Sequence, residues 1–321
     1  MPLSLRSALP ILLSSSIALE ASAYPKPGNT HRLSSIEGLP YEAFLITSSL
    51  TTEWFIKGVR RGLKGLDKAR VVFGDLIYGI VSSTISLTGT NTCLGSATLL
   101  TPLSVALGLS LRSKCLDMEC IVKNTGLVLS KTTVHDTLYF YKAVRCAKPS
   151  HLKISDETGG LVNVWSRDYA KRIIDANLKL IDVFEKSSRV EIVHDELINR
   201  YPRSREAAER LRIRFETHRD WNRAVVETYL YLLSENTDTL IARKFGMDQA
   251  YYVREKAREV YEQVIYKSSE WLRIVSKLDE EFKLKKLNPG SIADLTVSTI
   301  ALYLIKEFLL KKNLFISLYK H

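Results

Sequence analysis

A loop near the start of the chain, Glu20–Arg32, sets charged side chains among proline and glycine residues. Pro25 and Pro27 fix two backbone φ angles and end the helix that is expected to run through Glu20. Gly28 then lets the backbone turn, which leaves four polar residues on a stiff loop: Lys26, Asn29, His31 and Arg32. A carboxylate beside such cations suits proton transfer and phosphate binding. Taken alone, the segment is explained equally well as a helix exit with solvated charges.

A second polar loop, Gly89–Gly95, lies where a helix is expected to begin. Its glycines flank Thr-Asn-Thr and allow backbone N–H groups to approach an anion. The simpler explanation is that Thr90 or Asn91 caps the following helix, and for this loop alone we favour it.

A third such loop, Leu287–Leu295, combines a tight turn with a helix start. Ser291 and Asp294 have the spacing of a capping box, which explains both residues without a ligand. The cap does not account for the preceding Asn288-Pro289-Gly290, for which a tight turn is the alternative.

A fourth, weaker element is the short segment "NTDTLIARKFG". Asp238 is expected to start a helix that has Arg243 and Lys244 near its end and stops at Gly246. Cations at that end would be available to an anionic ligand.

The elements that position these loops are expected to be helices. Apolar residues recur at steps of three and four through 167–187 and 248–282, and the apolar stretch 294–310 indicates a buried helix. Few stretches alternate with a period of two. The sequence therefore predicts an all-α protein of roughly ten helices, one domain over 1–321, with 148–163 as the boundary if there are two lobes.

Composition narrows the class of protein. The net charge is +11, spread evenly along the chain, which suits nucleic acid, an acidic membrane surface or a polyphosphate substrate without choosing among them. No window approaches about 20 uninterrupted apolar residues, so no membrane span is expected. The basic run 57–70 lacks the interleaved aromatic residues that stack on bases, so nucleic-acid binding is a third-ranked alternative.

The four cysteines, at positions 93, 115, 120 and 146, form no metal-binding spacing. Sparse, unpatterned cysteine suggests a reducing, cytoplasmic setting. Two His-Asp pairs, His135-Asp136 and His194-Asp195, imitate those of helical phosphohydrolases. That chemistry also needs a further upstream His and downstream Asp, so we assign these pairs no catalytic role.

Residues 9–23 also have features of a signal peptide, with a small-residue sequence Ala21-Ser22-Ala23 at its end. We expect this segment to be a retained first helix instead. Glu20 and residues 25–32 form one motif across the supposed cleavage site. A charged residue such as Glu20 is also unfavourable just before such a site.

In this order, the four segments resemble the motifs of the triphosphoribosyl-dephospho-coenzyme A synthase family. The matching residues are Glu20, Pro25-Lys26-Pro27-Gly28 and Arg32; Gly89-Thr90-Asn91-Thr92 and Gly95; Asp238-Thr239 with Arg243 and Lys244; and Pro289-Gly290 with Ala293-Asp294-Leu295. The resemblance covers residues 14–305, and the family's all-α fold agrees with the periodicity.

The resemblance implies a transferase that joins C1′ of the ATP ribose to the 2′-hydroxyl of 3′-dephospho-CoA and releases adenine. The implied catalytic residues are Glu20, as general base or facing the developing cation, and Asp75. The implied substrate- and phosphate-binding residues are Lys26, Gly28, Arg32, Asn91, Thr92, Gly95, Arg243, Lys244, Asn288 and Gly290. Mg²⁺ is expected to accompany ATP, with Asp238 and Asp294 as its ligands.

Several positions depart from the family's pattern. Enzymes of known activity usually carry Asp at the position of His31, His and Lys at those of Cys93 and Leu94, and Asn at that of Leu240. A divergent branch of the family fits better. Two alternatives stay open: the same donor chemistry on another acceptor, or a helical nucleotide- or coenzyme-binding protein without catalysis.

The expected partners are therefore ATP and dephospho-CoA-like small molecules, without nucleic acid or membrane. A homodimer is compatible with the sequence, and the expected location is the cytoplasm.

Overall fold

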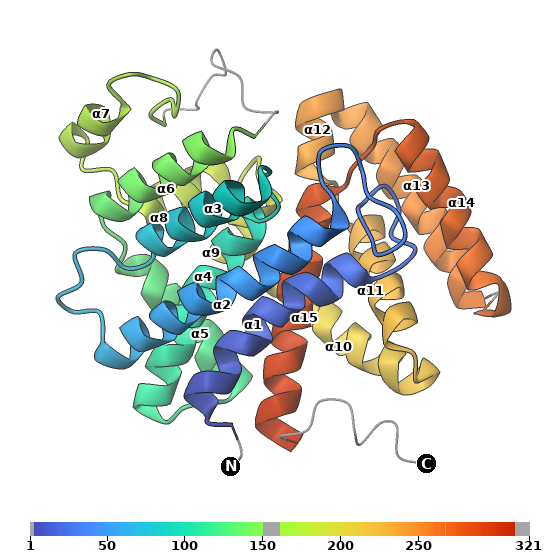
Figure 1. The fold of residues 1–321 in the computed structure, drawn as a ribbon, viewed down its shortest axis with the longest axis horizontal. Helices are drawn as coiled ribbons and strands as arrows, with labels where there is room; N and C mark the ends of the chain where they lie inside the picture. Colours follow the sequence, from blue (N-terminus) through green and yellow to red (C-terminus); the bar gives the residue numbers. More distant parts are fainter. Residues whose placement is uncertain (1–2, 150–160, 267, 312–321) are drawn as a thin grey trace. The chain divides into compact units, whose positions relative to one another are not determined.

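The computed structural model describes residues 3–149, 161–266 and 268–311 (Figure 1). These residues form fifteen α-helices, one short 3-10 helix and no strand, which confirms the all-α class. In chain order the helices are α1 (Leu5–Ser22), α2 (Tyr41–Lys64), α3 (Gly74–Thr88), α4 (Leu94–Ser113), α5 (Met118–Ser130), α6 (Val134–Ala147), α7 (Tyr169–Asp175), α8 (Leu180–Ser187), α9 (Ile192–Ile198), α10 (Pro202–His218), α11 (Trp221–Glu235), α12 (Thr239–Phe245), α13 (Met247–Tyr266), η1 (Ser268–Glu270), α14 (Trp271–Leu284) and α15 (Gly290–Lys311).

The chain divides into two compact units. The first contains residues 1–15 and 46–201, and the second contains 16–45 and 202–321. The chain passes from one unit to the other within α1, within α2 and just before α10. The sequence-based boundary at 148–163 falls inside the first unit, and residues 150–160 of it lie outside the described residues.

The first unit is organised around α3 and α4. Helix α3 packs on α6, while α4 packs on α5 and α9. Helix α2 approaches α4 so closely that a Cβ atom on Gly62 would lie 2.0 Å from the Val105 carbonyl oxygen. Gly58 has the same role, because its Cβ would lie 1.9 Å from Ser104 Oγ.

The second unit is built around α11 and α15. Helix α11 packs against α10, α13 and α15, and α15 also packs on α10 and α12. The buried residues of α11 are mostly apolar, with Glu227, Thr228 and Ser234 among them, and α15 is buried along most of its length, as its composition predicted.

The helix count differs from the expected ten because continuous apolar patterns are broken by the backbone. The 167–187 pattern divides into α7 and α8, with Asn177 in a left-handed conformation (φ 47°) between them. The 248–282 pattern divides into α13 and α14 around η1. Conversely, α2 continues through Gly58 to Lys64, since this glycine serves close packing and does not end the helix.

Helix α4 is the one helix in the described ranges that is long and apolar enough to cross a membrane by length and composition. Most of the helix (78% of the apolar window) is buried inside the protein.

Two of the four cysteines form a disulfide, Cys115–Cys120, between the end of α4 and the start of α5. This pairing was not foreseen from the sequence. Cys93 is a free, buried thiol, as expected of a core cysteine, and Cys146 is free and half-buried.

Candidate active site

The Pro25–Gly28 loop is held by side chains of α11, a helix of its own unit. Asn222, at the start of α11, accepts from the Tyr24 N–H (2.9 Å) and donates to the Tyr24 carbonyl (2.6 Å). About two turns further along α11, Tyr229 donates its hydroxyl to the Pro27 carbonyl (2.9 Å). The loop backbone therefore has specific partners at both ends, which explains how a glycine-containing loop is kept in one conformation.

Gly28 meets the connection between α14 and α15. Its φ is +73°, and a Cβ atom there would lie 2.1 Å from the Leu287 carbonyl oxygen and 3.1 Å from Pro289 Cδ. The neighbouring Asn29 donates to both Tyr229 Oη (2.8 Å) and the Pro289 carbonyl (3.2 Å). The first and third sequence motifs are thus in direct contact.

Glu20 and Lys26 form a buried ion pair at the heart of this loop. Lys26 Nζ lies 2.5 Å from Glu20 Oε1, and both side chains are about 98% covered. Burial raises the pKa of the Glu20 carboxyl, and Lys26 offsets this only in part. Burial likewise lowers the pKa of the Lys26 ammonium against the opposing effect of Glu20. Because the two pKa values move toward each other, transfer of the proton between the groups costs less than it would in water.

A second buried polar cluster joins the loop to α14. Asp279 accepts from the Gly28 N–H (3.0 Å), from His31 Nε2 (2.9 Å) and from Lys283 Nζ (2.8 Å). Burial lowers the pKa of the His31 imidazole, with Asp279 opposing the shift. The sequence analysis did not select Asp279 or Lys283; their only signal was an ordinary i,i+4 pair on an amphipathic helix.

Arg32 closes the loop from the outside. Its Nη1 donates to the Ser22 carbonyl and to Asn222 Oδ1, both at 2.7 Å, and its guanidinium lies over the Tyr24 ring. The side chain is exposed, so a ligand can reach it. Lys26, in contrast, is enclosed and already paired with a carboxylate.

Asp238 connects the second unit's remaining motifs. Its Oδ1 accepts from the Ile241 N–H in α12 and its Oδ2 accepts from the Ile292 N–H in α15, each at 2.9 Å. This residue therefore caps α15 from a distant helix, in place of the local cap expected from Ser291 and Asp294. The Ser291 hydroxyl instead bonds to Thr239 Oγ1 (3.0 Å).

The other predicted residues of the second unit surround this junction. Gly290 begins α15, and a Cβ atom there would lie 2.7 Å from the Leu240 side chain. Asn288 Oδ1 is buried and has no hydrogen-bond partner within the described part of the chain. Arg243 is half-buried at the end of α12, Lys244 is exposed, and Asp294 is half-buried just after the first turn of α15.

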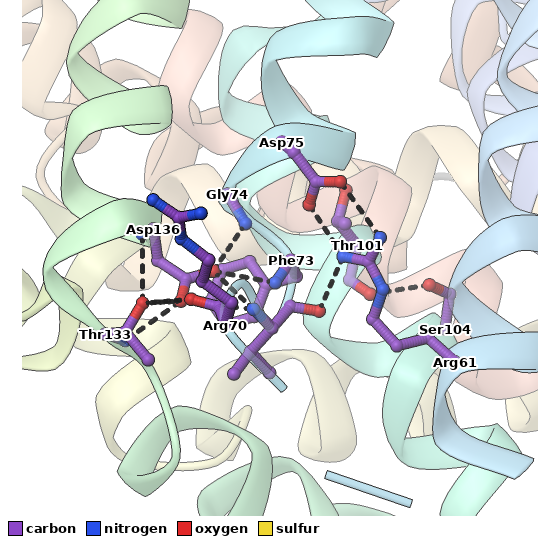
Figure 2. Close-up of polar contacts among 10 residues, drawn as sticks. Arg61, Arg70, Phe73, Gly74, Asp75, Thr101, Ser104, Thr133 and Asp136 are labelled. Atoms are coloured by element: carbon purple, nitrogen blue, oxygen red, sulfur yellow. Dashed lines mark hydrogen bonds and ion pairs between the residues drawn. The ribbon is translucent and has the colours of Figure 1, made fainter. Parts of the chain in front are cut away.

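In the first unit, Asp75 is committed to an ion pair at the start of α3. Arg61 donates to its two oxygens at 2.6 and 2.9 Å and also reaches the Val72 carbonyl (Figure 2). The pair is about three-quarters covered. A catalytic role for Asp75 would require a substrate that displaces or uses Arg61.

Beside this pair, Asp136 caps α3 from α6. Its Oδ1 accepts from the N–H groups of Val72, Phe73 and Gly74 at 2.8–2.9 Å, and its Oδ2 accepts from Thr133 (Figure 2). The carboxylate is fully buried. The His135-Asp136 pair is therefore structural, as the sequence analysis concluded.

The Gly89–Gly95 loop follows the opposite end of α3. Asn91 Oδ1 accepts from the N–H groups of Cys93 (3.3 Å) and Leu94 (3.1 Å), so Asn91 bonds to the start of α4, while the N-cap position itself is held by Cys93 and not by Thr90 or Asn91. Thr92 Oγ1 bonds to Thr47 Oγ1 (2.6 Å), and Gly95 is half-buried. Asp75 lies about 20 Å from this loop along the helix, so the two do not act on the same atom.

The structure thus brings together Glu20, Lys26 and Gly28 with Asn288 and Gly290 in the second unit. Within the first unit it keeps Asp75 apart from the 89–95 loop. Four supporting residues were not predicted from the sequence, and each bonds to the loop from far along the chain: Asn222, Tyr229, Asp279 and Lys283.

No group of three or more His, Cys, Asp or Glu side chains in the described ranges is placed to hold a metal ion. The two oxygens of Asp238 already accept backbone N–H groups, so this residue does not offer a ready inner ligand. Its assignment to Mg²⁺, with that of Asp294, stays a prediction.

The fold has a counterpart among solved structures. A crystal structure of a proposed triphosphoribosyl-dephospho-CoA synthase from Archaeoglobus fulgidus superposes with a TM-score of 0.62, over 82% of this chain and 98% of that one. The sequence identity is 22%, so this likeness defines the class as an all-α protein of that fold and nothing further.

The sequence itself identifies the family. The model of the ATP:dephospho-CoA triphosphoribosyl transferase family matches residues 7–313, and the chain belongs to that family. Proposed 2-(5''-triphosphoribosyl)-3'-dephosphocoenzyme-A synthases of Salmonella gallinarum and Salmonella typhimurium are 31% identical to it over 84 residues, or 26% of this chain. The matched segment spans 28% of the length of these relatives.

Proposed function

We propose that this protein transfers the triphosphoribosyl group of ATP to the 2′-hydroxyl of 3′-dephospho-CoA and releases adenine. The observation that carries the proposal is the buried Glu20–Lys26 pair inside the clamped Pro25–Gly28 loop. Burying two charges is costly, and a purely structural loop would be served as well by apolar side chains. The match of the family model along most of the chain supports the same reaction.

The reaction breaks the bond between ribose C1′ and adenine and forms one between C1′ and the acceptor oxygen. Adenine leaves with the electron pair of the broken bond, and the proton of the acceptor hydroxyl ends on a base. We assign that base, or the group facing the oxocarbenium-like ribose, to Glu20. The pair with Lys26 suits this role, because the hydrogen bond between the two side chains needs to rearrange only slightly when Glu20 accepts a proton.

The phosphates need cations that a ligand can reach. The pairing of Lys26 with Glu20 and of Lys283 with Asp279 leaves these clusters without net charge. Arg32, Arg243 and Lys244 are therefore the better phosphate ligands of the second unit, with Lys26 acting mainly on Glu20. Asn288 Oδ1 supplies an acceptor for a ligand N–H or hydroxyl.

ATP is proposed to enter as its Mg²⁺ complex. The phosphates then provide most of the metal's oxygen ligands, which fits a protein whose described residues form no preassembled cage. Asp238 and Asp294 are kept as candidate contacts to this ion or to its water ligands. The same proposal includes a cytoplasmic location and no requirement for membranes or nucleic acid. It is compatible with a homodimer.

Release of free adenine decides between catalysis and mere binding. The protein is incubated with MgATP, with and without 3′-dephospho-CoA, and adenine is quantified by chromatography. Adenine that depends on the acceptor supports the transferase. Binding of ATP without adenine release, with any acceptor tried, would support the coenzyme-binding alternative, for which Cys93 and Leu94 are the sequence evidence. Adenine release only with another hydroxyl acceptor would correct the acceptor and keep the donor chemistry.

A further inference from the structure

One carboxylate, Asp279 of α14, receives hydrogen bonds from three parts of the second unit. Its Oδ1 accepts from the Gly28 N–H, and its Oδ2 accepts from both His31 and Lys283. Asp279 is only 6% exposed. No motif assigned a function to it, yet it is the direct link between α14 and the loop that carries Lys26.

The hydrogen bonds define the tautomer of His31. The Leu33 N–H points at His31 Nδ1 (3.3 Å), so Nδ1 must hold a lone pair. Nε2 therefore carries the proton and donates it to Asp279. Lys283 Nζ lies 2.8 Å from the same Nε2 and also donates to Asp279, so in this tautomer two donors face each other and the shared carboxylate is what holds them together. Burial lowers the pKa of the imidazole, which favours its neutral form; Lys283 and Lys26 are nearby cations, Asp279 is its anion and the Tyr24 ring lies 5.1 Å away.

We propose that Asp279 is a positioning residue for the transferase: its carboxylate holds the Gly28 N–H and the Nε2–H tautomer of His31, and so fixes the loop that presents Glu20 and Lys26. The part of this proposal that concerns the rate rests on the proposed function. The part that concerns the tautomer does not.

The Asp279→Asn variant separates the charge from the shape. Its amide oxygen can still accept from Gly28, but the amide NH₂ then faces the Nε2–H of His31 and the Lys283 ammonium, donor against donor. Either His31 moves its proton to Nδ1, or the amide turns and gives up Gly28. Both outcomes loosen the loop.

The tautomer is read by ¹⁵N-detected histidine NMR of the full chain, with His31→Gln used to assign the signal among the six histidines. We expect the wild-type Nε2–H pattern to be lost or mixed in Asp279→Asn. In the adenine-release assay we expect kcat to fall about 10- to 100-fold, with a smaller change in the KM for ATP, because the reacting groups are misplaced rather than removed. Glu280→Gln is the matched control: it removes one exposed negative charge from the next residue and should leave both readouts unchanged.

An unchanged His31 spectrum in Asp279→Asn, or a kcat equal to that of Glu280→Gln, would overturn the proposal. If the wild type releases no adenine, the transferase fails but the spectrum still decides whether Asp279 fixes the tautomer. If Asp279→Asn does not fold by circular dichroism, Lys283→Met replaces it. Loss of that cation should move the titration of His31 to higher pH, and an unmoved titration would refute the described cluster.

Discussion

At the scale of single residues, the Glu20–Lys26 pair determines what the loop can do. A carboxyl whose pKa is raised by burial is a stronger base than an ordinary glutamate, and the lowered pKa of Lys26 makes that lysine a readier proton donor. Their contact at 2.5 Å means that substituting one alters the other. Mutational effects at these two positions are therefore expected to be non-additive.

Glu20→Gln should keep the size of the side chain and remove its basicity. We expect kcat for adenine release to fall about 100-fold or more, since general-base catalysis contributes about 10²–10⁴-fold. Steady-state kinetics checks this, with the exposed Glu42→Gln as the control for loss of a negative charge. Wild-type turnover of Glu20→Gln with normal metal dependence would remove Glu20 from the mechanism.

The pH dependence of the wild-type rate has a defined sign. Because the pKa of Glu20 is raised, its base form is lost at a higher pH than for an ordinary glutamate as the solution is acidified. The rate per bound substrate should therefore begin to fall above pH 4.5 on the acid side.

His31 should make the second unit sensitive to acid. Its folded pKa is lowered below 6.5, so the unfolded chain binds more protons between that pKa and 6.5, and stability falls as pH falls through this interval. His31→Gln can still donate to Asp279 but does not titrate. Urea unfolding at pH 7.5 and pH 5 should show a smaller acid-induced loss of unfolding free energy in the variant than in the wild type. Equal losses would contradict a buried neutral imidazole.

At the scale of helices, carboxylates from distant elements cap the helix starts. Asp136 of α6 caps α3, and Asp238, just before α12, caps both α12 and α15. A cap supplied from another helix stabilises the helix end and fixes its position at the same time.

Asp136→Ala should destabilise the protein by about 3 kcal/mol, because three buried N–H groups at the start of α3 lose their acceptor. Chemical denaturation measures the change. The neighbouring His135→Ala removes a side chain that is only partly buried and should cost less than about 1 kcal/mol. Similar losses for the two variants would argue against the capping role of Asp136.

The Cys115–Cys120 disulfide closes a short loop between α4 and α5. By the loop-entropy relation, a closure of this length contributes about 2 kcal/mol under oxidising conditions. Cys120→Ser should therefore lower stability by about that amount without reductant, and by much less with it. A wild type that is insensitive to reductant would show that the pair contributes little in solution.

At the scale of the whole molecule, the predicted residues lie in both compact units, and each unit can be examined on its own by hydrogen exchange. MgATP should slow exchange of backbone amides in residues 26–32 of the second unit. Protection of residues 89–95 would assign the first unit's loop to substrate as well.

At about 100 times its Kd, MgATP should also stabilise the folded protein by about 2.7 kcal/mol, seen as a higher melting midpoint. Magnesium sulfate serves as the control for ionic effects, and absence of both changes would contradict ATP binding.

The sequence by itself determined the all-α class, the four motifs and their residues. Helical periodicity is set by local side-chain spacing. A proline–glycine loop can be recognised from the sequence, because proline restricts the backbone and glycine frees it. The contact of Asn91 with the start of α4 could be predicted for the same reason: the donor and acceptor lie within three residues of each other.

The tertiary structure decided which partners these motifs have. No local sequence pattern indicates that Asp279 accepts a hydrogen bond from the Gly28 N–H across 251 positions, or that the Tyr229 hydroxyl donates to the Pro27 carbonyl across 202. The helix count also needed the fold, since Asn177 interrupts a continuous apolar pattern and Gly58 does not interrupt its helix. In each case the outcome depends on desolvation and close contact between distant segments. These effects arise only after the helices have packed.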